Sequence, residues 1–430
     1  MIVLSCLVLF ITIVTFFFKN KNVAHPIILF FGLWFSCILC ASLRLYGMQE
    51  YSSKSLVVIM TGLVSFAIGC GLAFLVKYYK FKIVPVEGLR PRKIRMNISK
   101  KMLYLILAAS FAGIILLDLA AVRALRHGVS YSYIRNMYYG YGNAKKLISS
   151  TFLNTYINWI SVPSLYALIP VSLINMFEKK GDKLFSALVM LAAVMYIFGS
   201  AGRFMLMFMV VQVVAMLNYY SHTITKKTKK RMVLIVIAVF AALMLLTVIR
   251  SEGASGKKVN TIYAYLSIPV YLLGYWLDAN GSVGRLHGSG FFYGILTFFN
   301  YFTSKLGFDI PAYRAAYDTI QVTQDQWVAV FPHEWYNAYV SMFYYFYIDF
   351  GMIGVILGCI LFGYLCYIVY YSAFVKKDKC ALLYYMLLIQ CIICSLVRWQ
   401  LGTITMVLTF IIEFMLTFNR IRLGGIKLRP

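Results

Sequence analysis

Long apolar runs separated by short polar segments form the dominant pattern along the chain. Eleven of these runs approach the roughly 20 residues that a transmembrane helix requires. They lie near residues 2–18, 27–46, 55–76, 102–121, 152–177, 184–199, 203–221, 232–249, 338–372, 381–397 and 402–419. The pattern predicts an all-α, polytopic integral membrane protein with about 11 transmembrane helices, forming a single transmembrane domain over residues 1–430.

The basic residues between the runs indicate the orientation of the chain. Lys and Arg are enriched in the short cytoplasmic loops of membrane proteins. With the N-terminus outside and the C-terminus in the cytoplasm, the cytoplasmic segments contain 26 of the 41 Lys and Arg residues. These segments are residues 19–25, 77–101, 178–183, 222–231, 376–379 and 420–430. The alternation therefore supports both the number of spans and this orientation.

Two segments on the outer face are longer than simple connections. They are residues 122–150 and a large extracytoplasmic loop at 250–336. Loops beyond about 12 to 15 residues are usually functional or disordered. The large loop is rich in apolar and aromatic residues and is interrupted by Pro269, Gly274 and Gly294. We therefore expect a structured loop containing short helices in the membrane interface, where Tyr and Trp are favoured.

The composition agrees with a membrane protein and excludes several other classes. The chain is 62% hydrophobic and only 13% charged, whereas soluble domains carry about 25% charged residues. A net charge of +27 could suggest a nucleic-acid partner, but the basic residues sit in short loops, so we expect none. The sequence contains no DxD motif and no cluster of His, Asp and Glu, and its cysteines lie in or beside apolar runs. We expect no metal and no cofactor.

The outer face carries more arginines than orientation requires. Arginine presents a planar, permanently charged fork that suits phosphate oxygens, so these residues point to an anionic, diphosphate-bearing ligand. Arg203, in "GSAGR" between two closely connected helices, is the strongest candidate. The alternative for any one arginine is a position among lipid headgroups or an ion pair with an acidic neighbour. The predicted substrate-binding arginines are Arg203, Arg135, Arg314, Arg250 and Arg398.

Asp349 is the only charged residue between Asn337 and Ser372. Counting about 22 residues back from the cytoplasmic end of this run places Asp349 near the outer boundary, with Gly351 allowing a bend after it. An ionisable residue at membrane depth is a candidate functional residue. The alternative is a buried ion pair with one of the outer arginines.

The segment "PHEWYNAYVSMFYYFYIDFGMIGVILGCILFGYL" resembles the signature of bacterial oligosaccharide repeat-unit polymerases, the Wzy or O-antigen polymerase family. The segments "HPIILFFGLWF", "SYSYIRNMYYGYG" and "GSAGRFMLM" are also similar, in the same order along the chain. The resemblance implies a glycosyltransferase that works without a metal at the outer face of the bacterial cytoplasmic membrane. It would transfer a growing glycan from undecaprenyl diphosphate onto the terminal sugar of another lipid-linked repeat unit, building O-antigen or capsular polysaccharide.

The chemistry of this transfer suggests roles for individual residues. Asp349, Glu334 and His333 are the candidate catalytic residues, since a carboxylate or imidazole could act as general base on the acceptor hydroxyl. Asn337 matches the family signature and is a candidate for substrate binding. The expected partners are the lipid-linked glycan donor and acceptor, membrane lipids and a chain-length regulator protein. An O-antigen ligase and a flippase or other transporter of the same pathway remain alternatives.

Overall fold

The computed structural model describes residues 8–16, 22–83, 99–140, 144–178, 181–221, 223–225, 259–279 and 286–417, with a few single positions between 226 and 258. The predicted span at 232–249 and Arg250 therefore lie outside the continuously described residues.

Six helices of the described part are long and apolar enough to cross a membrane. They are α2 (Pro26–Leu43), α3 (Ser53–Ile83), α4 (Lys100–Arg126), α6 to α7 (Thr151–Phe177), α8 (Lys183–Ser200) and α14 with its π-helical end (Ser341–Val375). Three shorter apolar helices accompany them, α9 (Phe204–Tyr219), α15 (Lys379–Cys394) and α16 (Ile404–Thr417). The prediction of an all-α, multi-pass membrane protein is confirmed, while the number of about 11 spans stays a prediction.

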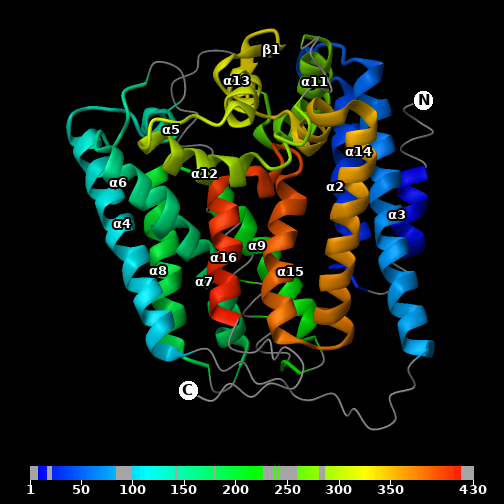
Figure 1. Cartoon of the computed structure of the whole chain (residues 1–430), viewed down its shortest axis with the longest axis horizontal. Helices are drawn as coiled ribbons and strands as arrows, with labels where there is room; N and C mark the ends of the chain where they lie inside the picture. Colours follow the sequence, from blue (N-terminus) through cyan, green and yellow to red (C-terminus); the bar gives the residue numbers. More distant parts are fainter. Residues whose placement is uncertain are drawn as a thin grey trace.

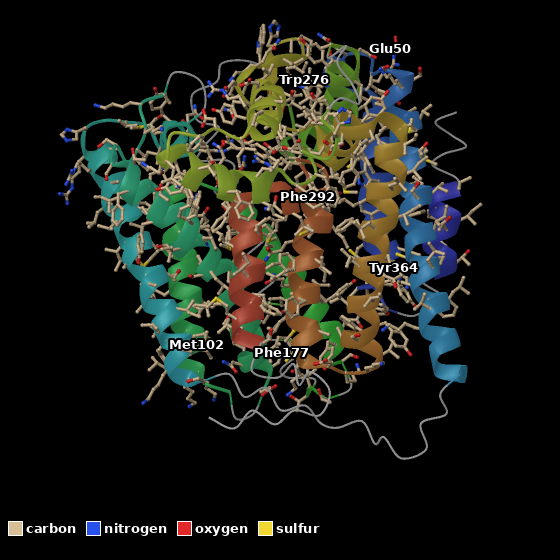
Figure 2. All side chains as sticks on the ribbon, viewed as in Figure 1. Glu50, Met102, Phe177, Trp276, Phe292 and Tyr364 are labelled. Atoms are coloured by element: carbon tan, nitrogen blue, oxygen red, sulfur yellow. The ribbon has the colours of Figure 1, made fainter. Side chains whose placement is uncertain are left out.

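The long helices run side by side, and several short elements cover one end of the bundle (Figure 1). We call residues 259–279 and 286–340 the cap. It contains α11 (Thr261–Ala279), α12 (Tyr293–Lys305), α13 (Pro311–Asp325) and the strands β1 (Val328–Phe331) and β2 (Glu334–Tyr336). Trp276 lies at the cap end, whereas Met102 and Phe177 lie at the opposite end (Figure 2). The cap corresponds to the described part of the predicted outer loop.

Small residues let α3 and α14 pack backbone to backbone. A Cβ atom on Gly69 would lie 2.1 Å from the carbonyl oxygen of Ile360, and one on Gly363 would lie 2.2 Å from that of Phe66. The thiol of Cys70 also donates to the carbonyl of Gly363, at 3.3 Å. Membrane helices associate through such close contacts, because lipid tails leave no hydrophobic driving force between them.

The bundle buries two large hydrophobic clusters. The first joins α2, α3 and α14 to α11 and other parts of the cap, with Trp34 and Phe343 fully buried. The second joins α4, α7, α8, α9, α15 and α16, with Leu165 and Tyr385 fully buried. The candidate site residues lie at the cap end, where these two halves of the bundle meet the cap.

The cap contains short helices, as predicted, but two of its features differ from the expectation. Pro269 and Gly274 were expected to interrupt helices, yet both lie inside α11, which continues from Thr261 to Ala279. A Cβ atom on Gly274 would lie 3.0 Å from the side chain of Ser52, so this glycine allows close packing rather than a break. The antiparallel hairpin of β1 and β2 was not predicted, because its strands are only four and three residues long.

The predicted bend after Asp349 is confirmed. Helix α14 has non-helical backbone angles at Phe350 (φ −141°) and at Gly351 (φ 62°, ψ −143°). The second conformation is accessible essentially to glycine alone. Residues 341–349 therefore form a separate short helical segment under the cap.

Candidate functional site

Arg203 is held against the cap at the turn between α8 and α9. Its Nη2 atom donates a hydrogen bond of 2.5 Å to the hydroxyl of Tyr265 in α11, and its guanidinium carbon lies 5.4 Å from the centre of that ring. The turn is tight, because α8 ends at Ser200 and Ala201 adopts a left-handed conformation (φ 47°). The charge of Arg203 is therefore fixed at the cap end of the bundle.

Arg135 lies on α5 (Tyr131–Tyr139) beside the same turn. Its guanidinium carbon is 5.9 Å from the centre of the Tyr139 ring. The Tyr139 hydroxyl lies against Gly202, where an added Cβ atom would come within 3.1 Å of it. Arg135 and Arg203, which are distant in sequence, thus flank one turn.

Four tyrosines from three helices meet next to this turn, and we call them the tyrosine cluster. They are Tyr138 and Tyr139 on α5, Tyr166 on α7 and Tyr196 on α8. Ring centres are 4.8 Å apart for Tyr138 and Tyr139, 6.3 Å for Tyr138 and Tyr196, and 6.4 Å for Tyr166 and Tyr196. Such edge-to-face contacts hold aromatic groups in defined orientations.

Arg398 lies at the cap end, just after α15. Its backbone N–H donates to the carbonyl of Cys394, the last residue of α15, at 2.9 Å. The neighbouring Trp399 packs on Phe291 of the cap, with ring centres 5.1 Å apart. Arg398 therefore lies beside the cap, whereas Arg135 and Arg203 lie at the turn next to the tyrosine cluster.

Glu334 binds Tyr336, a tyrosine within electrostatic reach of Tyr265, which binds Arg203. Its Oε1 accepts a hydrogen bond from the backbone N–H of Val259 at 3.0 Å, and its Oε2 accepts one from the hydroxyl of Tyr336. Burial and this bond to the carboxylate raise the pKa of the Tyr336 phenol, so it stays protonated and donating. Tyr336 also lies within electrostatic reach of Tyr265. The carboxylate of Glu334 and the guanidinium of Arg203 thus each bind a phenol of this pair of tyrosines.

Asp349 has a different environment from the one expected. It is 2% exposed, and its two oxygens accept hydrogen bonds from the backbone N–H groups of Gly290 and Phe291, both at 2.8 Å. Among the described residues no arginine forms a salt bridge with it, so the alternative of an ion pair with an arginine is not found there. A Cβ atom on Gly290 would lie 3.1 Å from the carboxylate. Asp349 fixes a turn of the cap, because it satisfies two backbone donors that the turn leaves free.

The remaining predicted residues lie apart from this group. Arg314 pairs with Asp309 at 2.9 Å, and both side chains are exposed. His333 is exposed between the two strands of the hairpin. Asn337 is buried and donates from its side chain to the carbonyl of Gln324. These contacts are structural in character and bring none of the three residues to the tyrosine cluster.

The tyrosine cluster was not identified as a site from the sequence. The segment containing Tyr138 and Tyr139 carried the only signal, a run of five tyrosines between residues 131 and 141. Tyr166 and Tyr196 belong to apolar runs, and their positions in the sequence give no sign of a site. Among the described residues, no group of three His, Cys, Asp or Glu side chains is arranged to hold a metal ion.

The arrangement can hold an anion beside aromatic surfaces. Guanidinium groups of Arg135 and Arg203 offer charge-assisted donors, and tyrosines offer both flat faces and hydroxyl groups. Comparisons of the chain with protein-family models, with curated proteins and with solved structures give no match. The site therefore has to be interpreted from its own chemistry.

Proposed function

We propose that the protein is a metal-independent membrane glycosyltransferase that polymerises undecaprenyl-diphosphate-linked oligosaccharide repeat units into O-antigen or capsular polysaccharide. One observation carries the proposal, namely that Arg135 and Arg203 flank the turn against which Tyr139 of the tyrosine cluster lies. Transfer of a glycan from a lipid diphosphate develops negative charge on the departing diphosphate. Fixed cations directed at that charge stabilise the transition state, and they need no metal to do so.

Within this proposal, Glu334 is the better candidate for the general base. Its carboxylate accepts from the backbone N–H of Val259 and from the hydroxyl of Tyr336, and its side chain is only partly buried. Asp349, in contrast, is buried, and both of its oxygens accept from backbone N–H groups of one turn. A base has to reach the acceptor hydroxyl within hydrogen-bond distance. We therefore assign Asp349 a role in positioning the cap.

The proposal further places the protein in the bacterial cytoplasmic membrane, with the N-terminus and the cap outside and the C-terminus in the cytoplasm. The alternation of Lys and Arg blocks along the sequence supports this orientation. Single cysteines at positions 228 and 255 of a cysteine-free variant test it. Position 255 should react with an impermeant reagent in intact spheroplasts, whereas labelling of 228 alone would reverse the orientation.

Arg203→Ala tests the function. In a strain that lacks the gene, the wild-type protein should restore long glycans, whereas Arg203→Ala should leave single repeat units at normal protein levels. We expect a loss of roughly 100-fold or more in polymerisation, as for removal of one fixed donor to a developing anion. Arg203→Lys keeps the charge but loses the planar fork, so it should also be impaired.

Arg314→Ala is the matched control, because Arg314 is exposed and paired with Asp309. It should leave glycan length unchanged. Normal glycan length in Arg203→Ala would exclude this arginine from the reaction. The deletion strain itself separates the alternatives, since loss of a ligase leaves no repeat unit attached to the acceptor and loss of a flippase leaves repeat units inside the cell.

A further inference from the structure

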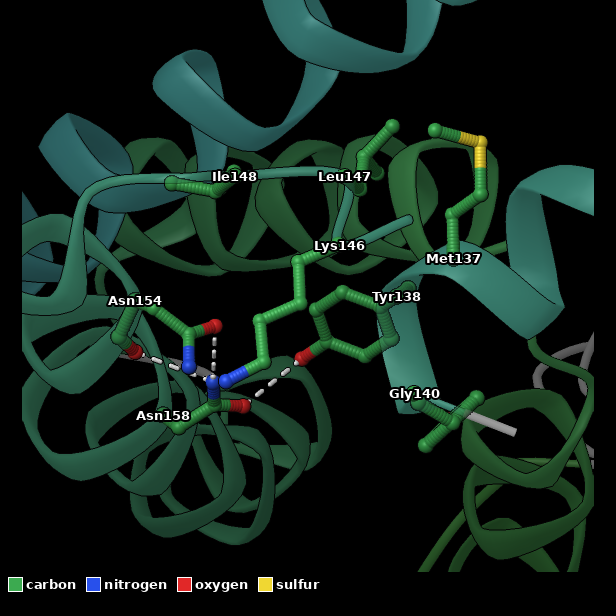
Figure 3. A pocket seen from close by; sticks show the side chains of 9 residues that line it. Met137, Tyr138, Gly140, Lys146, Leu147, Ile148, Asn154 and Asn158 are labelled. Atoms are coloured by element: carbon green, nitrogen blue, oxygen red, sulfur yellow. Dashed lines mark hydrogen bonds between the residues drawn. The ribbon is translucent and has the colours of Figure 1, made fainter. Parts of the chain in front are cut away.

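A cavity of about 320 Å³ opens beside the tyrosine cluster, at the edge of the bundle. Its walls come from the end of α5, from residues 146–148 and from the start of the α6 to α7 helix. Tyr138, Lys146, Asn154 and Asn158 provide its polar lining (Figure 3). Asn158 projects from a π-helical turn, Ile157–Ser161, a distortion that often occurs at functional sites.

The hydrogen bonds within this lining leave two of its donor groups without an acceptor among the described residues. The Tyr138 hydroxyl donates to Oδ1 of Asn158 at 3.1 Å. Nδ2 of Asn158 donates to the carbonyl and to Oδ1 of Asn154, at 2.9 and 3.0 Å. Burial raises the pKa of Tyr138, so its phenol remains a donor. The side-chain N–H groups of Asn154 and the ammonium of Lys146 have no acceptor among the described residues.

The charge of the lining agrees with this pattern. Lys146 is the one ionised side chain among the described lining residues, and none of them is acidic. An amide with free N–H groups and an ammonium together require a ligand with several acceptor oxygens and a negative charge. Phosphate has these properties, whereas a neutral sugar would leave the lysine unpaired.

The surroundings of the cavity indicate where such a phosphate comes from. Phe152 on α6 is 76% exposed and Ile160 in the π-helical turn is 44% exposed, both beside the asparagines in sequence. Exposed apolar side chains on a membrane-length helix are suited to contact with lipid tails. An ammonium group beside amide N–H groups can hold the phosphate of an anionic lipid head group.

We propose that this cavity binds the phosphate of an anionic phospholipid head group, with Lys146 and Asn154 as the donors that recognise it. The cavity shares Tyr138 and Tyr139 with the tyrosine cluster, but lipid binding to Lys146 and Asn154 does not depend on the reaction proposed above. The predicted effect of binding is to tie α5, and with it Tyr138 of the tyrosine cluster, to the end of the α6 to α7 helix.

The test compares two neighbouring lysines in the full-length protein. Purified protein is reconstituted in nanodiscs of phosphatidylcholine with increasing phosphatidylglycerol, and retained lipid is counted by native mass spectrometry. Lys146→Gln should weaken phosphatidylglycerol retention roughly ten- to hundredfold, the effect of losing one charge-assisted hydrogen bond. Lys145→Gln makes the same charge change outside the cavity lining and should behave as wild type.

A second variant tests the side-chain amide of Asn154 and leaves the charge of Lys146 in place. Asn154→Asp keeps the acceptor used by Asn158 but replaces the free N–H groups with a negative charge, so retention should again be lost. Equal loss in Lys145→Gln and Lys146→Gln, or unchanged retention in both Lys146→Gln and Asn154→Asp, would overturn the proposal. If the wild-type protein retains inorganic phosphate as effectively as phosphatidylglycerol, the ligand is free phosphate and the proposal of a lipid source is overturned.

Discussion

Two buried carboxylates, at the cap end and within the bundle, provide an instructive contrast. Asp349 is 2% exposed and receives two backbone N–H groups from the cap. Glu413 on α16 is fully buried, yet neither of its oxygens has a hydrogen-bond partner among the described residues. In the sequence the two residues look alike, since each is a single acid within an apolar run.

The difference shows that burial alone does not reveal what an acid does. A carboxylate that accepts backbone N–H groups stabilises the fold, because removing it strands those donors. An acid without partners contributes no such bonds, and a polar residue inside a membrane helix usually has another reason to be there. The contacts of each group therefore decide its interpretation, and each contact can be tested separately.

The largest expected effect is that of Asp349→Asn. One oxygen of the carboxylate becomes an NH₂ group that cannot accept, so one backbone N–H is left facing a donor. Hydrogen bonds to charged groups contribute about 1.5 to 3 kcal/mol each, and we expect a loss of about 3 kcal/mol in unfolding free energy. Thermal unfolding of the purified protein in detergent measures it.

Asp309→Asn is the control for this variant, because it makes the same chemical change in an exposed ion pair. Its effect should stay within about 1 kcal/mol. If Asp349→Asn is instead as stable as wild type but inactive in glycan polymerisation, Asp349 belongs to the catalytic residues and the structural interpretation is wrong.

A buried base, His25, extends the comparison to the way stability depends on pH. His25 is 3% exposed at the start of α2, its Nδ1 accepts from the N–H of Ile27 at 3.3 Å, and burial lowers its pKa from 6.5 to about 4. The unfolded chain takes up this proton first, so stability is complete above pH 6.5 and falls as the pH drops toward 4. The shift corresponds to about 3 kcal/mol at most. His25→Asn, a neutral capping residue, should flatten the unfolding temperature over this pH range, and an unchanged slope would exclude His25 as the cause.

Gly351→Ala tests the bend that presents Asp349 to the cap. No atom lies within 4 Å of the position of the added Cβ, so the substitution acts only through the backbone. Holding alanine at φ 62° and ψ −143° should cost roughly 1 to 3 kcal/mol. Gly32→Ala, also without a neighbour within 4 Å but inside a regular helix, should be neutral or stabilising. Equal unfolding temperatures for the two variants would show that α14 tolerates a different bend.

The smallest expected effect is that of Glu413→Gln, despite complete burial. The substitution preserves shape and removes no hydrogen bond, so the unfolding free energy should change by less than about 1 kcal/mol. Glu413→Leu should be at least as stable as wild type, because it removes a buried polar group that lacks partners. A loss as large as that of Asp349→Asn would mean that Glu413 has a partner in the working protein, and the contrast between the two acids would disappear.

The sequence predicts much of the fold because membrane spans obey a local rule. Length and apolarity alone identify helices such as α4 and α8, and a glycine after Asp349 is sufficient to predict a bend. Local rules fail in the cap. Pro269 and Gly274 look like helix breakers, but α11 packs against α2 and α3 and continues through both positions.

The candidate site is predictable only in part for the same reason. An excess of arginines in the segments predicted to lie outside marks Arg135, Arg203 and Arg398, since charge is visible in a sequence. Their partners are tertiary, because Tyr265 lies 62 residues from Arg203 in the chain. Asp349 was recognised as unusual, but no pattern could indicate that its partners are backbone N–H groups of a turn.

The distance along the chain between Asp349 and its turn has a consequence for how the protein is made. Gly290 and Phe291 precede Asp349 by 59 and 58 residues, so the ribosome delivers the turn well before the side chain that satisfies it. Until α14 is made, the two amides of the turn lack the carboxylate that accepts from them in the folded protein, and Phe291 lacks the ring of Phe346, which later lies 5.5 Å away. Completion of the cap is thereby coupled to insertion of α14, and a chain that stalls before Ser341 has the cap sequence without the residue that closes it.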